Sequence, residues 1–255
     1  MRYENLLSTF KNELGYINAT NQYVELSVRI TERDYESTLR ENLQGLAKSV
    51  NLNVSNLAED YMHRISKSYI VNVHSCFENF LKSFKCFPGS PTNISSITKN
   101  NDDDWLEWTL GIAVPVKRNE IKNDIIICEY YRLVRNCVVH NGTISAEMKN
   151  KRSLISTSTN SRLHAPNDVN SLTFDDQVLF SRAANNVANF IFKNSQYNIC
   201  AIVEAHKENL LNLVKPYQEL TARSIAVKKM KRYISLLYPE FTDVDWEQEI
   251  ANLLS

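Results

Sequence analysis

The sequence predicts an all-α protein, and three observations lead to that prediction. Five glycines and six prolines occur among 255 residues, whereas proteins average about 7% glycine and about 5% proline. Turn-rich β-sandwiches, barrels and Rossmann-type folds need more of both. Apolar residues recur at spacings of three and four, the period of a helix with one buried face. A hydrophobic content of 43% and a charged content of 23% are ordinary for a globular domain and exclude global disorder.

The N-terminal 50 residues predict a pair of helices. In residues 2–28, apolar side chains follow the helical spacing. Thr31 precedes Asp34 at the spacing of a capping box, so we expect a second helix to begin there and continue to about Leu46. The polar segment 51–56 ends this pair.

The clearest helical pattern begins near Ser55. Its apolar residues form an unbroken i, i+4 series: Leu57, Tyr61, Ile65, Tyr69, Val73, Phe77 and Leu81. A stripe of this length must be buried by other helices. Phe87-Pro88-Gly89 stops the helix, and residues 88–103 form a polar loop. A short helix should follow and end before Pro115.

The second half of the chain continues the helical pattern. Residues 117–140 predict a helix that Asn141-Gly142 ends. Residues 143–172 are polar and without periodicity, so they predict a long excursion or a small hairpin. Further helices are expected at residues 175–191, 195–216, 219–238 and 243–254.

Charge and cysteine content restrict the functional class. Lys and Arg total 29, as do Asp and Glu, which argues against a polybasic nucleic-acid binder but leaves a local basic cleft open. The five cysteines are widely spaced without a C-x-x-C, so we expect reduced thiols in a cytoplasmic protein and no zinc site. No apolar run is long enough for a membrane span, and no secretory signal opens the chain. No cofactor is expected.

Two polar clusters lie outside any catalytic motif. Three adjacent carboxylates, those of Asp102, Asp103 and Asp104, do not converge on a divalent ion without distant ligands, so a loop or a helix N-terminus is favoured. Residues 228–232 carry three lysines and Arg232. They predict either an RNA-backbone contact or, as the favoured alternative, the solvated side of an amphipathic helix.

The chemically informative segment is YYRLVRNCVVHNG, residues 130–142. It places Arg135 and His140 five positions apart at the end of an apolar helix. Asn136 and His140 are four apart and share a helix face, and Arg132 continues that row backwards. Polar groups on an interior face cost free energy to desolvate, which favours a functional role. The alternative is that Arg135 and His140 cap helix carbonyls.

A second polar row lies on the long helix, where His74, Glu78 and Lys82 are spaced by four. The row borders the apolar stripe, so a carboxylate there could meet an arginine from a neighbouring helix. The alternative for Glu78 and Lys82 is an exposed ion pair of a few tenths of a kcal/mol.

The segment SCFENFLK, residues 75–82, followed about fifty residues later by YYRLVRNCVVHNG, resembles the HEPN superfamily (higher-eukaryote and prokaryote nucleotide-binding domains). Arg135, Asn136 and His140 match its R-x-x-x-x-H motif with a polar residue after the Arg. Glu78 and Lys82 match the first part of the E-x-x-x-K-R that some members carry, and Ser83 stands in place of the final Arg. The resemblance spans residues 55–215. It implies an up-and-down helical bundle, with residues 1–50 as an N-terminal helical pair, 51–215 as the HEPN-like core and 216–255 as a C-terminal helical extension.

The resemblance implies a metal-independent endoribonuclease that works as a homodimer, as an effector or toxin in antiviral defence or a toxin–antitoxin system. The implied catalytic residues are Arg135, Asn136, His140 and Glu78, with Lys82 and Arg132 binding substrate. The implied partners are RNA, with tRNA as one candidate, and a second copy of the chain; an antitoxin, a nucleotidyltransferase or an ATPase sensor are further candidates. Two alternatives stay open: a non-catalytic HEPN-like dimerisation or sensor module, and an unrelated helical scaffold.

Overall fold

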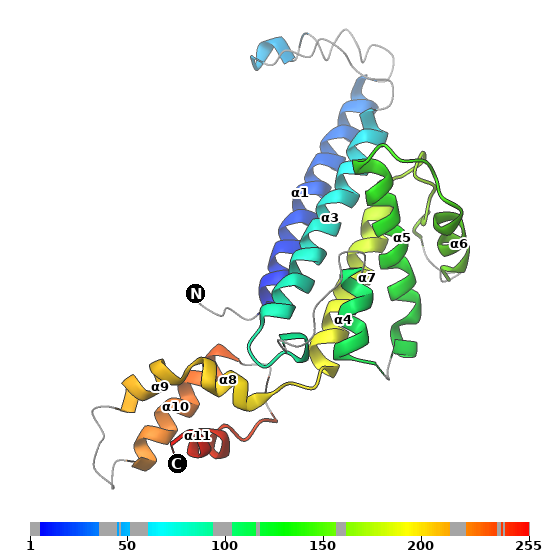
Figure 1. Cartoon of the computed structure of the whole chain (residues 1–255). Coiled ribbons are helices and arrows are strands. Elements are labelled where there is room, and N and C mark those ends of the chain that lie inside the picture. Colours follow the sequence, from blue (N-terminus) through cyan, green and yellow to red (C-terminus); the bar gives the residue numbers. More distant parts are fainter. Residues whose placement is uncertain are drawn as a thin grey trace. The chain divides into compact units, whose positions relative to one another are not determined.

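The structure is a computed structural model that describes residues 6–35, 45, 47–51, 61–93, 104–115, 118–156, 162–214, 223–238, 241 and 243–254. Within these ranges every regular element is helical (Figure 1), which confirms the all-α prediction. The α-helices are α1 (Leu6–Tyr35), α3 (Tyr61–Cys86), α4 (Trp105–Ala113), α5 (Lys122–Val139), α6 (Ala146–Leu154), α7 (Phe174–Asn194), α8 (Ile199–Ala205), α9 (Lys207–Val214), α10 (Arg223–Leu237) and α11 (Trp246–Leu254). Two 3-10 turns are η1 (Pro91–Asn93) and η2 (Arg118–Ile121). None of the helices in the described ranges is both long and apolar enough to cross a bilayer.

The chain divides into two compact units, each built from several stretches of sequence. Unit 1 comprises residues 1–10, 78–120 and 188–255, and unit 2 comprises residues 11–77 and 121–187. The division expected at residues 50 and 215 stays a prediction.

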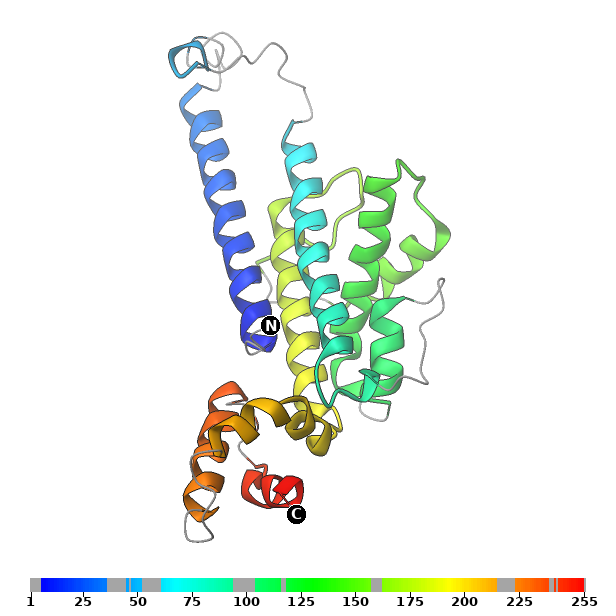
Figure 2. The ribbon, with the colours of Figure 1, turned by 60° about the vertical axis from the view of Figure 1, so that its left-hand side comes forward.

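Unit 2 is a helical bundle in which α7 contacts three other helices. The parts of α1, α3, α5 and α7 that belong to this unit run alongside one another in two views (Figures 1 and 2). The contacts of α7 are Gln177–Asn18 with α1 (2.6 Å between Nε2 and Oδ1), Phe174–Tyr69 with α3 (ring centroids 5.9 Å apart) and Phe180–Tyr131 with α5 (5.0 Å). Small buried residues of α7, Ala183 and Ala184, let these helices approach closely.

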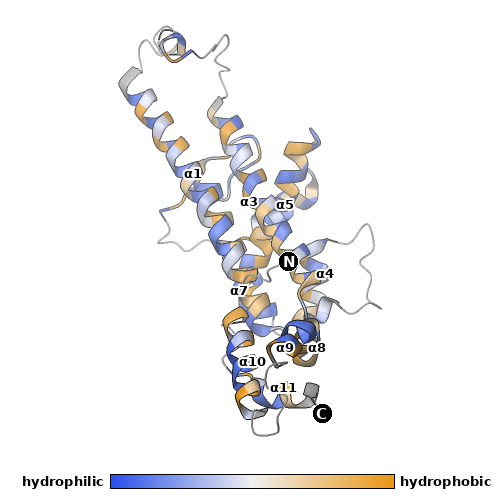
Figure 3. Ribbon diagram, turned by 90° about the vertical axis from the view of Figure 1, so that its left-hand side faces the viewer, coloured by the Kyte–Doolittle hydropathy of each residue, from blue (hydrophilic) through white to orange (hydrophobic). Residues whose placement is uncertain are grey.

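The core of unit 2 follows the apolar stripes expected from the sequence. Tyr69, Ile70 and Val73 of α3 are buried, as are Tyr131 and Val134 of α5. Figure 3 shows hydrophilic and hydrophobic residues interspersed along α1 and α3, the pattern of helices that bury one face. Leu57, the first residue of the expected α3 stripe, lies outside the described residues.

Unit 1 has an aromatic core around Phe87. The Phe87 ring lies 5.7–6.4 Å, between centroids, from the rings of Phe192, Tyr197, Tyr238 and Phe241. Gly89 makes the turn after α3 at φ +75°, and a Cβ there would collide with Asn198 O and Ile202. The predicted stop at Phe87-Pro88-Gly89 is confirmed by the end of α3 at Cys86.

The prediction that a new helix begins near Thr31 is wrong, because α1 continues to Tyr35. Thr31 Oγ1 donates to Ser27 O at 2.8 Å, and Ser27 Oγ donates to Tyr23 O at 2.8 Å. Hydroxyls that bond back four residues belong to a helix interior rather than a cap. The expected continuation through residues 36–44 lies outside the described residues.

Two other boundaries differ from expectation. The segment 143–172 contains α6, for which Ser145 Oγ accepts the Met148 N–H at 3.0 Å as N-cap; no hairpin occurs in its described part. The segment 195–216, expected as one helix, contains two helices. α8 begins after its N-cap Asn198, and α9 begins after a break at His206. The His206 ring is buried, with Nε2 2.7 Å from Tyr238 Oη, and this packing fixes the break.

Candidate functional site

The candidate site lies at the carboxyl end of α5, where the chain leaves the helix in a defined turn. Asn141 takes the left-handed conformation, with φ +49°, and Gly142 N–H donates to Cys137 O at 2.9 Å. This is the hydrogen bond of a Schellman motif, with Asn141 at the left-handed position. The predicted helix stop is confirmed, and Asn141 rather than Gly142 supplies the unusual backbone angle.

The turn places the three predicted motif residues together. Arg135 Nη1 donates to Asn136 Oδ1 at 3.1 Å, and His140 N–H donates to Asn136 O at 3.0 Å. Arg135 and Asn136 are half-buried, and the His140 side chain is exposed. The bond from Arg135 goes to a side-chain oxygen, whereas His140 is the C-cap residue of α5 and its backbone N–H donates to the helix carbonyl of Asn136. The capping alternative therefore holds for the His140 backbone and not for the Arg135 bond.

The end of α5 is also uncovered. Val134 is fully buried, but none of residues 135–147 is buried, and Val139 is 45% exposed beside His140. Arg132 is half-buried one turn earlier. The helix therefore presents an Arg, an Asn and a His next to exposed apolar surface.

A buried polar network holds α5 in place, and its central residue, Asp176, is not among the site residues predicted from the sequence. The Asp176 carboxylate is 0% exposed. It accepts hydrogen bonds from Tyr131 Oη (2.8 Å), from the Asn167 backbone and side chain (2.7 and 2.8 Å), and from the Thr173 backbone and hydroxyl (2.8 and 3.3 Å). Burial, and after it the charge of Asp176, raises the pKa of Tyr131 well above its ordinary value, so Tyr131 remains a donor.

A recognisable sequence signal could have identified Asp176. Thr173 immediately precedes α7 and Asp176 is its third residue, so T-x-x-D has the spacing of a capping box. The Thr173 backbone N–H donates to the Asp176 carboxylate, as the return bond of such a box does. The same carboxylate also accepts a hydrogen bond from the Tyr131 hydroxyl, in the apolar surroundings of α5. No local sequence pattern predicts this contact.

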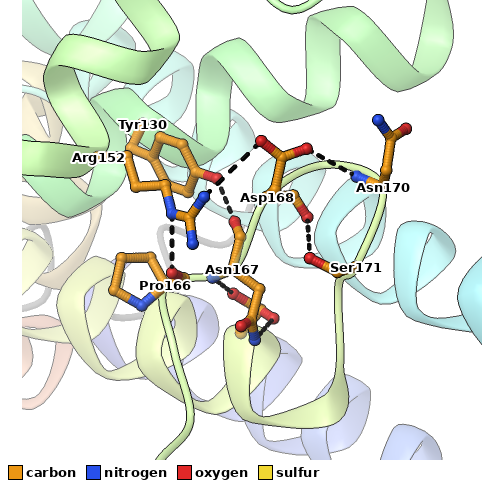
Figure 4. A network of polar contacts seen from close by, with 8 residues as sticks. Tyr130, Arg152, Pro166, Asn167, Asp168, Asn170 and Ser171 are labelled. Carbon is orange, nitrogen blue, oxygen red and sulfur yellow. Dashed lines mark hydrogen bonds and ion pairs between the residues drawn. The ribbon is translucent and has the colours of Figure 1, made fainter.

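The loop 162–173 ties α5 to α6 through a second set of contacts (Figure 4). Tyr130 Oη donates to Asn167 O. Arg152 of α6 donates to Pro166 O at 3.0 Å and lies 3.7 Å from the Asp168 carboxylate. Lys151 forms an ion pair with the buried Glu129 of α5. Together these contacts fix the helix that carries Arg135 and His140 while its end stays uncovered.

Glu78 and Lys82 belong to unit 1. Lys82 Nζ lies 3.2 Å from Glu78 Oε1, and the side chains are 45% and 28% exposed. The ion pair considered as an alternative is therefore present. Lys82 Nζ also lies 5.8 Å from the centre of the Trp105 ring, a cation–π distance. The roles expected for Glu78 beside Arg135 and for Lys82 on substrate stay predictions.

The remaining polar clusters have structural explanations. Asp104 is the N-cap of α4, accepting the Leu106 N–H at 3.0 Å, which confirms the helix-terminus interpretation; Asp102 and Asp103 lie outside the described residues. In α10, Lys231 pairs with Glu247 at 2.8 Å on the solvent side, while Met230 and Ile234 are buried. Across the described ranges, no three His, Cys, Asp or Glu side chains gather as a metal site would require. All five cysteines lie among the described residues, and none of them is paired in a disulfide.

Comparison of the chain with protein-family models, with curated proteins and with solved structures gives no match.

Proposed function

We propose that this protein is a metal-independent endoribonuclease of the HEPN type, with Arg135, Asn136 and His140 at its active site. The observation that carries the proposal is the uncovered end of α5, where these three side chains lie within one helical turn and a half. Arg135 contacts Asn136, and His140 is exposed to a substrate. The resemblance of residues 130–142 to the R-x-x-x-x-H motif supplies the reaction class.

The residues suit cleavage by the ribose 2′-hydroxyl. That reaction needs a base for the 2′-hydroxyl, an acid for the leaving 5′-oxygen and positive charge beside the pentacoordinate phosphorane. His140 moves a proton, and Arg135 binds the phosphate. The bond to Asn136 uses one of the five guanidinium N–H donors, so others are free for phosphate oxygens. Asn136 orients Arg135 and can donate its own amide to the phosphate.

A second copy of the chain completes the site. One imidazole cannot act as base and acid in the same step, so a two-fold pairing of α5 ends gives the reaction two histidines. Val139, exposed beside His140, provides apolar contact area for that pairing. The same resemblance assigns the protein to RNA-targeting effectors or toxins of antiviral defence, with tRNA as the first substrate to examine.

The test is incubation of the purified chain with tRNA and total RNA in EDTA. We expect cleavage by the wild type, and a loss of about 100-fold or more in rate for His140→Ala and for Arg135→Ala, the usual effect of removing a proton carrier or a charge stabiliser. Two exposed residues of the same unit provide matched controls, His164→Ala and Arg162→Ala, which should retain full activity.

The outcome separates the proposal from the alternatives. If folded His140→Ala and Arg135→Ala cleave RNA at the wild-type rate, the nuclease activity does not arise from this site. If the wild type cleaves no RNA but still forms dimers, the chain is a non-catalytic dimerisation or sensor module.

A further inference from the structure

A polar groove between α1 and α7 lies apart from the helix that carries Arg135 and His140. Its volume is about 350 Å³, at the lower end of the range for small-molecule sites. The polar residues that line it are Lys11, Asn18, Gln22, Gln177, Ser181, Arg182 and Asn185. All of them belong to unit 2.

The floor of the groove is preorganised. Asn18 Oδ1 accepts hydrogen bonds from Gln177 Nε2 at 2.6 Å and from Ser181 Oγ at 2.8 Å. These bonds fix the Gln177 amide with its nitrogen toward Asn18. Its carbonyl oxygen, Oε1, is buried and has no hydrogen-bond partner within the described residues, and the whole side chain is 1% exposed. A buried acceptor without a donor costs free energy, and a ligand N–H that displaces the side chains covering Gln177 would satisfy it.

The rim of the groove is cationic. Lys11 and Arg182 are exposed at it, and no Asp or Glu is among the lining residues. Arg182 also lies within electrostatic range of the Asp124 carboxylate, which is not a lining residue. The two lining cations together match an anion. A phosphate monoester carries close to two negative charges at neutral pH, and arginine binds it through two parallel N–H donors.

We propose that this groove binds a small organic phosphate that carries an N–H donor, with the phosphate between Lys11 and Arg182 and the N–H directed at Gln177 Oε1. Two ligand sources share this chemistry: a nucleoside monophosphate with an exocyclic amine and an amino-sugar phosphate. The groove has room for one such molecule. The inference is independent of the proposed ribonuclease activity, because it uses α1 and α7 rather than α5.

Calorimetric titration of the full chain with four probes tests the proposal. AMP and glucosamine 6-phosphate carry both groups, adenosine lacks the phosphate, and inorganic phosphate lacks the N–H donor. We expect at least one of the first two to bind more tightly than adenosine and inorganic phosphate, and the better of the two identifies the ligand class. Arg182→Gln and Lys11→Gln should each weaken that binding by about tenfold or more, the effect of one charge-assisted hydrogen bond. Lys149→Gln, an exposed lysine of α6, is the control.

Gly15, which also lines the groove, allows a test without loss of folding. A Cβ built on Gly15 meets no atom within 4 Å. Gly15→Ala should therefore keep binding, whereas Gly15→Leu should fill the groove and abolish it, and both should raise helix stability. The proposal is overturned if neither organic phosphate binds at millimolar concentration, or if binding persists unchanged in Arg182→Gln and Gly15→Leu. If these variants lose affinity for RNA while the binding of small phosphates is unchanged, the groove contacts RNA instead.

Discussion

At the scale of single residues, one buried carboxylate joins three segments of unit 2. The Asp176 carboxylate of α7 accepts hydrogen bonds from Tyr131 of α5 and from Asn167 and Thr173 of the preceding loop. A buried carboxylate is tolerated only when its oxygens are satisfied, and five hydrogen bonds meet that condition here. The position of α5, and with it the candidate site, depends on this residue.

Asp176→Ala should therefore lower the free energy of unfolding by about 3 kcal/mol, because it leaves buried donors from Tyr131 and Asn167 without an acceptor. Asp175→Ala in the same helical turn is the control. Asp175 accepts one exposed hydrogen bond, from His164 N–H at 2.8 Å, so its loss should cost less than about 1 kcal/mol. Urea denaturation measures both, and equal losses would contradict the role given to Asp176.

At the scale of elements, the sequence predicted the long helices well because their signals are local. The apolar stripe of α3 and the Asn141-Gly142 stop of α5 depend on spacing and backbone preference alone. The misplaced boundaries depend on tertiary contacts. Thr31 carries a capping pattern that the continuing α1 overrides, and the break at His206 depends on a ring packed against Tyr238, 32 residues away. The spacing of apolar residues along a helix gives no information about a contact with a residue so far away in the sequence.

The break at His206 makes a prediction about pH. Burial lowers the pKa of His206 below its ordinary value of 6.5, so the unfolded chain binds a proton that the folded chain does not. The contribution of His206 to stability is then fully present above about pH 6.5 and declines as the pH falls toward the folded-state pKa, by at most about 1.4 kcal/mol per pH unit. His206→Gln has no titrating ring and should lose this part of the slope. Urea midpoints between about pH 7.5 and about pH 5.5 measure it, and identical slopes for the two proteins would refute the assignment.

At the scale of the whole molecule, the two groups of residues that the sequence proposed for a site differ in how far sequence could define them. Arg135 and Asn136 lie in α5 and His140 is its C-cap residue, so their spacing alone placed them together. Glu78 and Lys82 lie on α3, in unit 1, and sequence could say only that they share a helix face. The sequence left two interpretations of this pair, a carboxylate that meets an arginine of a neighbouring helix and an ion pair between Glu78 and Lys82. The ion pair is present. Neither sequence periodicity nor the helix-stop pattern could have indicated Asp176 as the support of α5.

The proposed pairing of α5 ends predicts a dimer that a surface charge disrupts. Val139 is 45% exposed, so Val139→Glu should leave the fold intact while placing a carboxylate in the contact. We expect a dimer for the wild type and a monomer without RNA cleavage for the variant, by light scattering and a cleavage assay at the same concentration. Leu154→Glu on α6, where Leu154 is 55% exposed, is the control and should remain an active dimer. If the Val139→Glu protein stays dimeric, the end of α5 does not form the dimer interface.

The chemistry of the cleaved ends tests the central claim most directly. Attack by the ribose 2′-hydroxyl, with His140 moving the proton and Arg135 on the phosphate, leaves a 2′,3′-cyclic phosphate or 3′-phosphate on one fragment and a free 5′-hydroxyl on the other. Mass spectrometry of an oligoribonucleotide cleaved in EDTA should find these ends with the wild type and no fragments with His140→Ala. Fragments with 3′-hydroxyl and 5′-phosphate ends, or fragments of any kind from folded His140→Ala at the wild-type rate, would contradict the account.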